Sequence, residues 1–236
     1  MHRSLEQPQA SPKATGILLF LLLLNILNMV DRTLITSFGT AIITDLGLSD
    51  SQFGLLTGPI FVFFYSIMGL FMGALADRVH RPRLIAAGLL LWSALTAVSG
   101  MAKSFVQIGV ARLFIGVGES AMTPSAISMI SDLFPKARRG TATGIYYLGV
   151  PLGAGGSFIV AGILGPMIGW RNCFFLLGGV GVVLALGLLL AVARKIPAAD
   201  RFTRNADWLD GPFPLTRKLT GAKLGIVGMG RIGQAI

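Results

Sequence analysis

The chain has 236 residues, of which 53% are hydrophobic and 13% charged, and its formal net charge is +10. A soluble domain carries about 25% charged residues, so this composition excludes an ordinary soluble protein and indicates a membrane protein. The basic residues lie between apolar runs rather than on one polar face among aromatic residues, which argues against nucleic-acid binding. One cysteine and two histidines form no disulfide framework or metal-ligand cluster, so we expect no metal site.

The first apolar run follows a polar segment, residues 1–16, which we predict to be a cytoplasmic tail. This run continues beyond Asn25, no small-residue cleavage site follows it, and further apolar runs come later. It is therefore interpreted as a transmembrane helix and not as a signal peptide. About 20 apolar residues are needed to cross the hydrocarbon core. Six runs reach that length, and they lie near residues 17–43, 52–75, 84–102, 105–130, 139–165 and 171–193.

Basic residues mark one side of the predicted bundle. Connections 76–83 and 131–138 each carry several, and Arg194 and Lys195 follow the last run, whereas each connection on the other side carries at most one. Short loops rich in Lys and Arg stay in the cytoplasm. With an even number of spans, the sequence predicts an integral protein of the cell (inner) membrane whose two termini are cytoplasmic.

Four ionisable residues lie inside the predicted spans: Asp31, Arg32, Arg112 and Glu119. A charge inside the bilayer is costly unless it is paired or hydrated, so function is the default hypothesis; the alternative is an ion pair that only holds helices together. Arg112 and Glu119 share a helix face two turns apart, so we expect a neighbouring helix to link them. The adjacent Asp31 and Arg32 point about 100° apart. A buried carboxylate near an arginine can exchange protons, which is the basis of a hypothesis of proton coupling.

Two pairs of glycines, Gly69 with Gly73 and Gly149 with Gly153, are spaced four residues apart in predicted spans. Small residues at this spacing let helix backbones approach in lipid. Pro151 lies within the second pair, and membrane helices tolerate such prolines when neighbours satisfy the freed carbonyl. We interpret Gly149, Pro151 and Gly153 as a helix-packing motif, with direct contact to a solute as the alternative.

The loop after the second run has the spacing Gly73-x3-Asp77-Arg78-x2-Arg81-x-Arg83. The next apolar run begins at once, so this short loop joins two antiparallel helices on one side of the membrane. The pattern resembles the loop between the second and third helices of the major facilitator superfamily. The resemblance implies that Gly73, Asp77, Arg78 and Arg81 belong to a cytoplasmic gate.

Two further segments, 28–32 and 112–119, resemble the amino-terminal half of the same superfamily, and the likeness covers about residues 15–196. Within the superfamily, segments 118–139 and 146–153 are similar to the spinster-like carriers of lysolipids and organic anions, although anion:cation symporters share the Asp-Arg pair and the loop motif. Members have two six-helix halves with the solute site between them near the midplane.

The resemblance implies secondary active transport of a small organic or amphipathic solute, coupled to protons. Asp31, Arg32 and Glu119 would be the proton-linked and solute-facing charges, supported by Arg112. The implied partners are the lipid bilayer, the solute and protons. A second six-helix half is also implied, because a single half has nothing to rock against, and we expect a monomer of this chain not to transport.

The character of the chain changes after Ile196. Residues 197–222 are polar and predict a linker, and an apolar β-branched run then enters Gly228-x-Gly230-x-x-Gly233. This is the dinucleotide fingerprint, in which the glycines allow a tight turn and a close approach to the pyrophosphate. It resembles the start of the nucleotide-binding domain of D-2-hydroxyacid dehydrogenases.

A working dinucleotide site also needs a second strand and an acidic ribose ligand about 20 residues further on. The sequence stops one turn into the helix, so we predict that residues 223–236 are a truncated strand and glycine loop without catalytic residues. We expect no enzyme activity and no cofactor, with NAD bound only by a longer product.

The sequence thus predicts an all-α membrane protein with six transmembrane helices, half of a major facilitator fold, in residues 17–196, followed by a short strand fragment. The predicted function is proton-coupled solute transport by a truncated half-transporter. Two alternatives remain: an NAD-dependent D-2-hydroxyacid oxidoreductase fragment on a membrane anchor, and a non-transporting scaffold whose buried charges are only structural.

Overall fold

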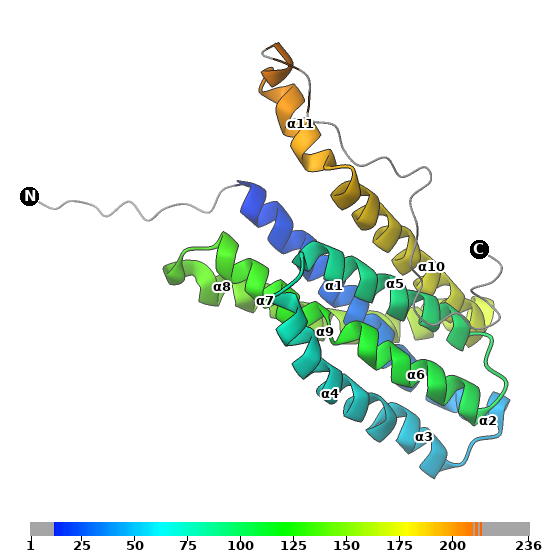
Figure 1. Ribbon diagram of the computed structural model, residues 1–236. Helices are drawn as coiled ribbons and strands as arrows, with labels where there is room; N and C mark the ends of the chain where they lie inside the picture. The colour runs from blue at the N-terminus through cyan, green and yellow to red at the C-terminus, as the bar shows by residue number, and fades with distance from the viewer. Residues whose placement is uncertain (1–11, 210, 212, 214–236) are drawn as a thin grey trace, which may run out of the picture. The chain divides into compact units, whose positions relative to one another are not determined.

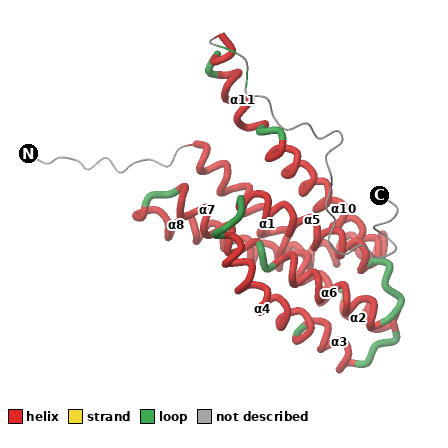
Figure 2. Tube along the Cα trace, in the orientation of Figure 1, coloured by secondary structure: helices red, strands yellow, loops and turns green. Residues whose placement is uncertain are grey.

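A computed structural model describes residues 12–209, 211 and 213. Throughout these residues the regular structure is helical and includes no strand (Figures 1 and 2), which confirms the predicted all-α class. The predicted strand and glycine loop with Gly228, Gly230 and Gly233 lie outside the described residues. The chain divides after Leu189 into two compact units, and each is described by itself.

The first unit consists of helices that often follow one another with hardly a loop between them. Helices α1, α2, α3, α4 and α5 span Pro12–Ser37, Gly39–Leu46, Asp50–Thr57, Pro59–Ala76 and Arg81–Ser99. Helices α6, α7, α8 and α9 span Phe105–Glu119, Met122–Leu133, Lys136–Tyr147 and Gly149–Ile159; the π-helix η1 (Val160–Leu164) and α10 (Gly165–Ala193) follow.

Several helix ends follow from local sequence chemistry. Helix α3 starts with a capping box, in which the Ser49 hydroxyl accepts from the Gln52 backbone N–H and the Gln52 side chain accepts from the Ser49 backbone N–H. Proline stands in the first turn of α4 (Pro59) and of α5 (Pro82), where a missing N–H costs no hydrogen bond. Gly47 ends α2 with a φ of 61°, a conformation that glycine adopts without steric cost.

Five helical stretches within the described residues are long and apolar enough to cross a membrane: Ala14–Ser37, Asp50–Ala76, Arg81–Ser99, Phe105–Leu133 and Lys136–Ala193. The first four correspond to the first four predicted spans. The predicted fifth and sixth spans both fall inside the last stretch, which is 58 residues long. Its helix is broken in φ and ψ only at Gly169 (φ 78°, ψ 160°), so six separate helices are not resolved.

The segments on the two sides of Gly169 pack against different helices. Before it, α9 lies along α1 (Figure 1), and Gly165 lies against the ring of Phe38 just after α1. After it, α10 lies along α5, where Gly178 backs onto Ala97 and Gly181 onto Ser93. The chain therefore changes its packing partner at this one glycine.

The core of the first unit consists of two apolar clusters with a polar layer between them. Leu24 of α1 belongs to one cluster and Leu34 to the other. Between these two residues, α1 carries Asn28 and Asp31, both of which are buried. The fold thus places buried polar groups near the middle of α1, with apolar packing above and below them.

The outer surface of α4 is unusually apolar: Phe63, Leu70 and Phe71 are exposed, Leu70 to 79%. In water such a face would be costly, whereas in a membrane it can be covered by acyl chains or by another apolar helix. Together with the five candidate spans, this surface identifies an integral membrane protein.

The second unit contains the end of α10, helix α11 (Ile196–Arg204) and the short 3-10 helix η2 (Asp207–Leu209). In α11, Arg204 Nε lies 2.9 Å from Asp200 Oδ1 one turn earlier. The rings of Phe202 and Phe213 meet edge to face with centroids 5.2 Å apart. The described part of the predicted linker is therefore largely helical.

Candidate functional site

A buried ion pair joins α1 to α6. The Arg32 Nε and Nη2 atoms lie 3.0 and 2.9 Å from Glu119 Oε2. The Glu119 side chain is 0% exposed, while that of Arg32 retains 23% exposure. Glu119 Oε1 is also buried and accepts no hydrogen bond from a described residue. This ion pair is the most buried of the four ion pairs among the described residues, and breaking a buried pair by removing one partner costs about 3–5 kcal/mol.

Two aromatic rings of α4 complete the surroundings of Arg32. Its Cζ atom lies 4.9 Å from the ring centroid of Phe61 and 4.4 Å from that of Tyr65, and the two rings stack at 5.5 Å. The guanidinium of Arg112 also lies 4.9 Å from the Phe61 ring. Desolvated cation–π contacts stabilise by about 2 kcal/mol. Phe61 and Tyr65 are thus part of the charged site, although no feature of the sequence distinguished them from other apolar residues of the span.

Arg112 contacts the same group of residues through a hydrogen bond to the backbone of Arg32. Its Nη2 atom donates a hydrogen bond to the Arg32 carbonyl oxygen at 3.2 Å, and the described residues include no ion pair between Arg112 and Glu119. Arg32, on the neighbouring helix α1, lies between them and contacts both.

Asp31 faces a different helix from Arg32. The Thr96 hydroxyl of α5 lies 2.6 Å from Asp31 Oδ2, whereas Arg32 points towards α4 and α6. This agrees with the angle of about 100° between adjacent helix positions. The four charges therefore form one layer, but Asp31 and Glu119 have different hydrogen-bond partners.

At one end of the bundle, Arg81 at the start of α5 forms an ion pair with Asp132 near the end of α7. Asp77 and Arg78, from the same predicted gate motif, are exposed and form no side-chain hydrogen bond or ion pair with another described residue. Sequence reasoning missed Asp132, because a carboxylate at the end of a span looks like an ordinary loop residue.

At the other end, Arg171 connects three parts of the chain. Its Nη2 lies 2.9 Å from Asp45 Oδ2 beyond α1, and its Nη1 donates to the carbonyl oxygens of Gly100 and Ala102 at 3.0 and 2.6 Å. The Trp170 Nε1–H also donates to Asp45 Oδ2 at 3.0 Å. The sequence had shown Arg171 only as an isolated basic residue, so this cluster was not predicted.

The two glycine pairs differ in their surroundings. A Cβ atom at Gly149 would lie 2.7 Å from Asn25 Nδ2, and one at Gly153 would lie 2.5 Å from the Ile26 carbonyl oxygen, so both glycines allow α9 to approach α1. At Gly69 and Gly73, nothing described lies within 4 Å of such an atom. Close helix packing at this first pair is therefore not present in the described chain.

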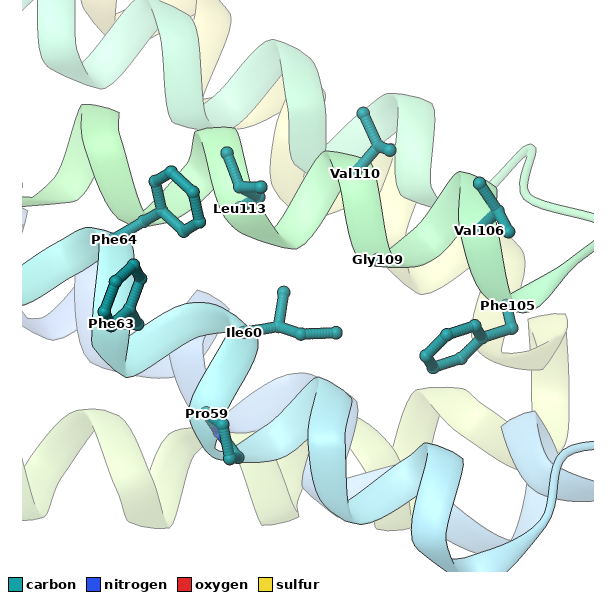
Figure 3. Close-up of a pocket in the computed structure, with 9 residues that line it drawn as sticks. All are labelled: Pro59, Ile60, Phe63, Phe64, Phe105, Val106, Gly109, Val110 and Leu113. Carbon is teal, nitrogen blue, oxygen red and sulfur yellow. The ribbon is translucent and has the colours of Figure 1, made fainter.

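An apolar groove of about 500 Å³ runs between α4 and α6 (Figure 3). Its walls include Ile60 and Phe63 on one side and Val106 and Val110 on the other. None of the four buried charges lines it. The groove therefore lacks polar groups that could orient a charged solute or exchange a proton.

The sequence matches the family model of the Major Facilitator Superfamily over residues 21–228. An MFS-type efflux pump of Mycolicibacterium smegmatis is 32% identical over 200 residues, which are 84% of this chain and 46% of the relative. A probable L-galactonate transporter of Escherichia coli is 31% identical over 173 residues, which are 73% of this chain and 38% of the relative.

Among solved structures, a bacterial homologue of the human lysosomal transporter Spinster, in an inward-facing and unoccupied conformation, matches with a TM-score of 0.68 and 35% identity. The match covers 77% of this chain and 43% of that one. These relatives are transporters and not enzymes, and the chain spans less than half the length of each. On the family match and the shared helical fold, the chain belongs to the Major Facilitator Superfamily.

Proposed function

We propose that the chain forms the amino-terminal half of a spinster-like secondary active transporter, which moves a small organic or amphipathic solute in exchange for, or together with, protons. The observation that carries the proposal is the charged layer formed by the buried Asp31, Arg112 and Glu119 and the partly buried Arg32. A protein that only spans the bilayer does not need four charged residues within the membrane, because each of them is costly to desolvate. The transporter relatives support the same function.

We propose that the stretch Lys136–Ala193 crosses the membrane twice. A helix rises 1.5 Å per residue, so 58 residues exceed one crossing by far, and the packing partner changes from α1 to α5 at Gly169. This gives six crossings. The end that carries Arg81, Arg138 and Arg139 would then be cytoplasmic, because short basic connections stay on that side.

A second six-helix half would cover the faces that the chain leaves open. Leu70 and Phe71 of α4 are exposed, and Gly69 and Gly73 have no described neighbour, although glycines at this spacing favour close helix contact. In members of the superfamily the halves enclose the solute site. Arg32, the least buried member of the charged layer by its side chain, would face that site.

The direct test joins this chain to the carboxyl-terminal half of a spinster homologue and measures uptake into proteoliposomes. Lysolipids, sugar acids and other organic anions would be offered with and without a pH gradient. We expect saturable uptake of at least one solute that responds to the gradient. Uptake no greater than in empty liposomes for every solute would contradict the proposal and favour a scaffold.

We also propose that Asp77, Arg78, Arg81 and Asp132 form the cytoplasmic gate. In the joined protein, Asp132→Asn should slow uptake several-fold and leave solute affinity nearly unchanged, because Asp132 lies at the end of the bundle, away from the buried layer. The Arg81 and Asp132 side chains are 28% and 64% exposed, and such pairs stabilise by only about 0–1 kcal/mol, so thermal stability should hardly change.

Uptake rate, solute binding and thermal unfolding would be measured on the same preparations. Asp200→Asn is a matched control, since Asp200 forms an exposed pair with Arg204 in α11 outside the proposed gate. Equal loss of solute binding in Asp132→Asn would show that the residue serves the solute site instead.

For residues 223–236 we propose the beginning of a dinucleotide-binding sequence joined to the transporter half, as the glycine spacing indicates. A working dinucleotide site also uses a second strand and an acidic ribose ligand further along the chain. Sequencing the transcript across this junction tests the proposal; a frame that continues into further transporter helices would overturn it.

A further inference from the structure

A pocket of about 420 Å³ lies between the first turns of α1 and the first half of α8. Thr15 and Leu18 of α1 line one side of it, and Arg138, Thr141 and Ile145 of α8 line the other. Its volume is within the range of about 300–1,000 Å³ that is usual for ligand sites. Unlike the groove between α4 and α6, this pocket has both polar and apolar walls.

The polarity of these walls changes along the two helices. The polar residues Thr15 and Arg138 stand near the starts of α1 and α8, whereas the apolar Leu18 and Ile145 follow one and two turns later. Seven residues of helix, from Arg138 to Ile145, rise about 10 Å. Because both helices enter the bilayer from these starts, the pocket reaches from the headgroup level into the hydrocarbon core.

Arg138 gives the polar end of the pocket a positive charge. Its side chain is partly buried and forms no hydrogen bond or ion pair with another described residue, whereas the adjacent Arg139 Nε donates to the Phe134 carbonyl oxygen at 3.0 Å. Thr15 and Thr141 add hydroxyl groups, and no carboxylate lines the pocket. A guanidinium binds phosphate oxygens through two parallel hydrogen bonds, so this end suits a phosphate group.

We propose that the pocket binds an anionic phospholipid of the adjacent leaflet. Its phosphate would lie at Arg138, Thr15 and Thr141, and its first acyl carbons against Leu18 and Ile145. Basic pockets between membrane helices favour anionic headgroups. A zwitterionic headgroup is less suitable, because its ammonium group would find no carboxylate in the lining. The proposal requires that α1 and α8 enter the bilayer, but not that the chain moves a solute.

The lining also favours a lipid over two other occupants. An apolar helix packed into the pocket would bury Arg138 without a counter-charge, which is costly. A small soluble anion would pair with Arg138 but would leave the apolar end of the pocket uncovered. A phospholipid has a phosphate and acyl chains in the order that the walls present.

Native mass spectrometry of the full chain in detergent tests the proposal, with phosphatidylglycerol or phosphatidylcholine added in equal amounts. We expect the chain to retain more phosphatidylglycerol. Arg138→Gln should lower this retention about tenfold, because it removes charge-assisted hydrogen bonds to the phosphate. Lys136→Gln is the matched control: it removes the same charge from an exposed side chain that does not line the pocket, and retention should hardly change.

Ala137→Trp tests the space separately from the charge. Ala137 is exposed and lines the pocket, so the larger side chain should fill it with Arg138 still present, and retention should fall as in Arg138→Gln. Thermal unfolding without lipid would show that the variants fold. Added phosphatidylglycerol should then stabilise the parent chain and Lys136→Gln, but neither Arg138→Gln nor Ala137→Trp, because a ligand stabilises only the chain that binds it.

Equal retention of the two lipids, or an equal loss in Lys136→Gln and Arg138→Gln, would overturn the proposal. Displacement of the lipid by an equal concentration of sn-glycerol 3-phosphate would also overturn it, because a free anion would then suffice. Loss of retention in the joined protein would show that the second half covers the pocket instead. A joined protein that transports a solute but retains no phosphatidylglycerol would refute this inference and leave the proposed function intact.

Discussion

Replacing Glu119 by glutamine is expected to abolish the pH dependence of uptake in the joined twelve-helix protein and to lower the free energy of unfolding by about 3–5 kcal/mol. Glutamine has nearly the shape of glutamate but no charge. Arg32, which lies 2.9 Å from the carboxylate, would be left partly buried without its counter-charge. The loss is large because the other charged neighbour, Arg112, repels it.

The effect on pH dependence follows from the charges that remain. With glutamine at this position, the negative charge of Glu119 no longer acts on Asp31, whereas the guanidinium of Arg112 still does. A nearby cation favours the ionised form of a carboxyl, so we expect Asp31 to bind a proton less readily in each cycle.

Uptake between about pH 5 and 8 and chemical unfolding of the same variant would check this result. Asp50→Asn is the matched control, since it makes the same chemical change at an exposed carboxylate of α3 and should alter neither quantity appreciably. If Glu119→Gln retained the pH dependence of the parent protein, Glu119 would have no part in proton coupling and would serve the structure alone.

The positions of the charged residues within the spans could be predicted because they interrupt runs of apolar residues. Asp31, Arg32, Arg112 and Glu119 interrupt runs in which a charge is costly. Which of them pair could not be predicted, because the sequence does not say which helices are neighbours. Glu119 could have faced either residue of the Asp31–Arg32 pair, and only the structure places Arg32 beside it.

Other contacts around the charged residues left no signal in the sequence. Thr96 is a common residue in membrane helices, and only the structure shows that its hydroxyl lies 2.6 Å from Asp31 Oδ2. Asp132 and Arg171 lie at span ends, where charged residues are ordinary. The sequence predicts two spans between Lys136 and Ala193, whereas the structure has one helical stretch there, whose helix α10 departs from helical φ and ψ at Gly169.

Glycine spacing predicted packing at one pair but not at the other. Gly149 and Gly153 lie against α1, while Gly69 and Gly73 have the same spacing and no described neighbour within 4 Å. The pattern shows that a helix can be approached closely. It does not show whether the approaching helix belongs to the same chain, so the first pair could be placed only by the structure.

A second prediction concerns Gly153, which packs closely against α1. We expect Gly153→Ala to lower the free energy of unfolding by about 1–3 kcal/mol, because the added methyl group overpacks this contact. The added methyl group would lie 2.5 Å from the Ile26 carbonyl oxygen and 2.5 Å from Met29 Cβ, and 3.1 Å from the Val30 backbone nitrogen. None of these atoms is the end of a flexible side chain, so α9 and α1 must move apart.

Gly155→Ala provides the control, because it adds the same methyl group to the same helix two residues later, where no described atom lies within 4 Å. Replacing glycine by alanine within a helix favours the helix by about 1 kcal/mol, so this variant should match or exceed the parent chain in stability. Thermal and chemical unfolding in detergent would measure both. Equal stability of the two variants would mean that α1 and α9 do not lie as close as described.

The same substitution should also affect the charged layer, because Met29 and Val30 directly precede Asp31 and Arg32 on α1. A displacement of α1 by part of an ångström lengthens the Arg32–Glu119 contact, now 2.9 Å, and the Asp31–Thr96 contact, now 2.6 Å. In the joined protein, Gly153→Ala should therefore reduce uptake as well as stability. Loss of stability with unchanged uptake would show that the layer tolerates movement of α1, and the close packing of α9 would then serve only the fold.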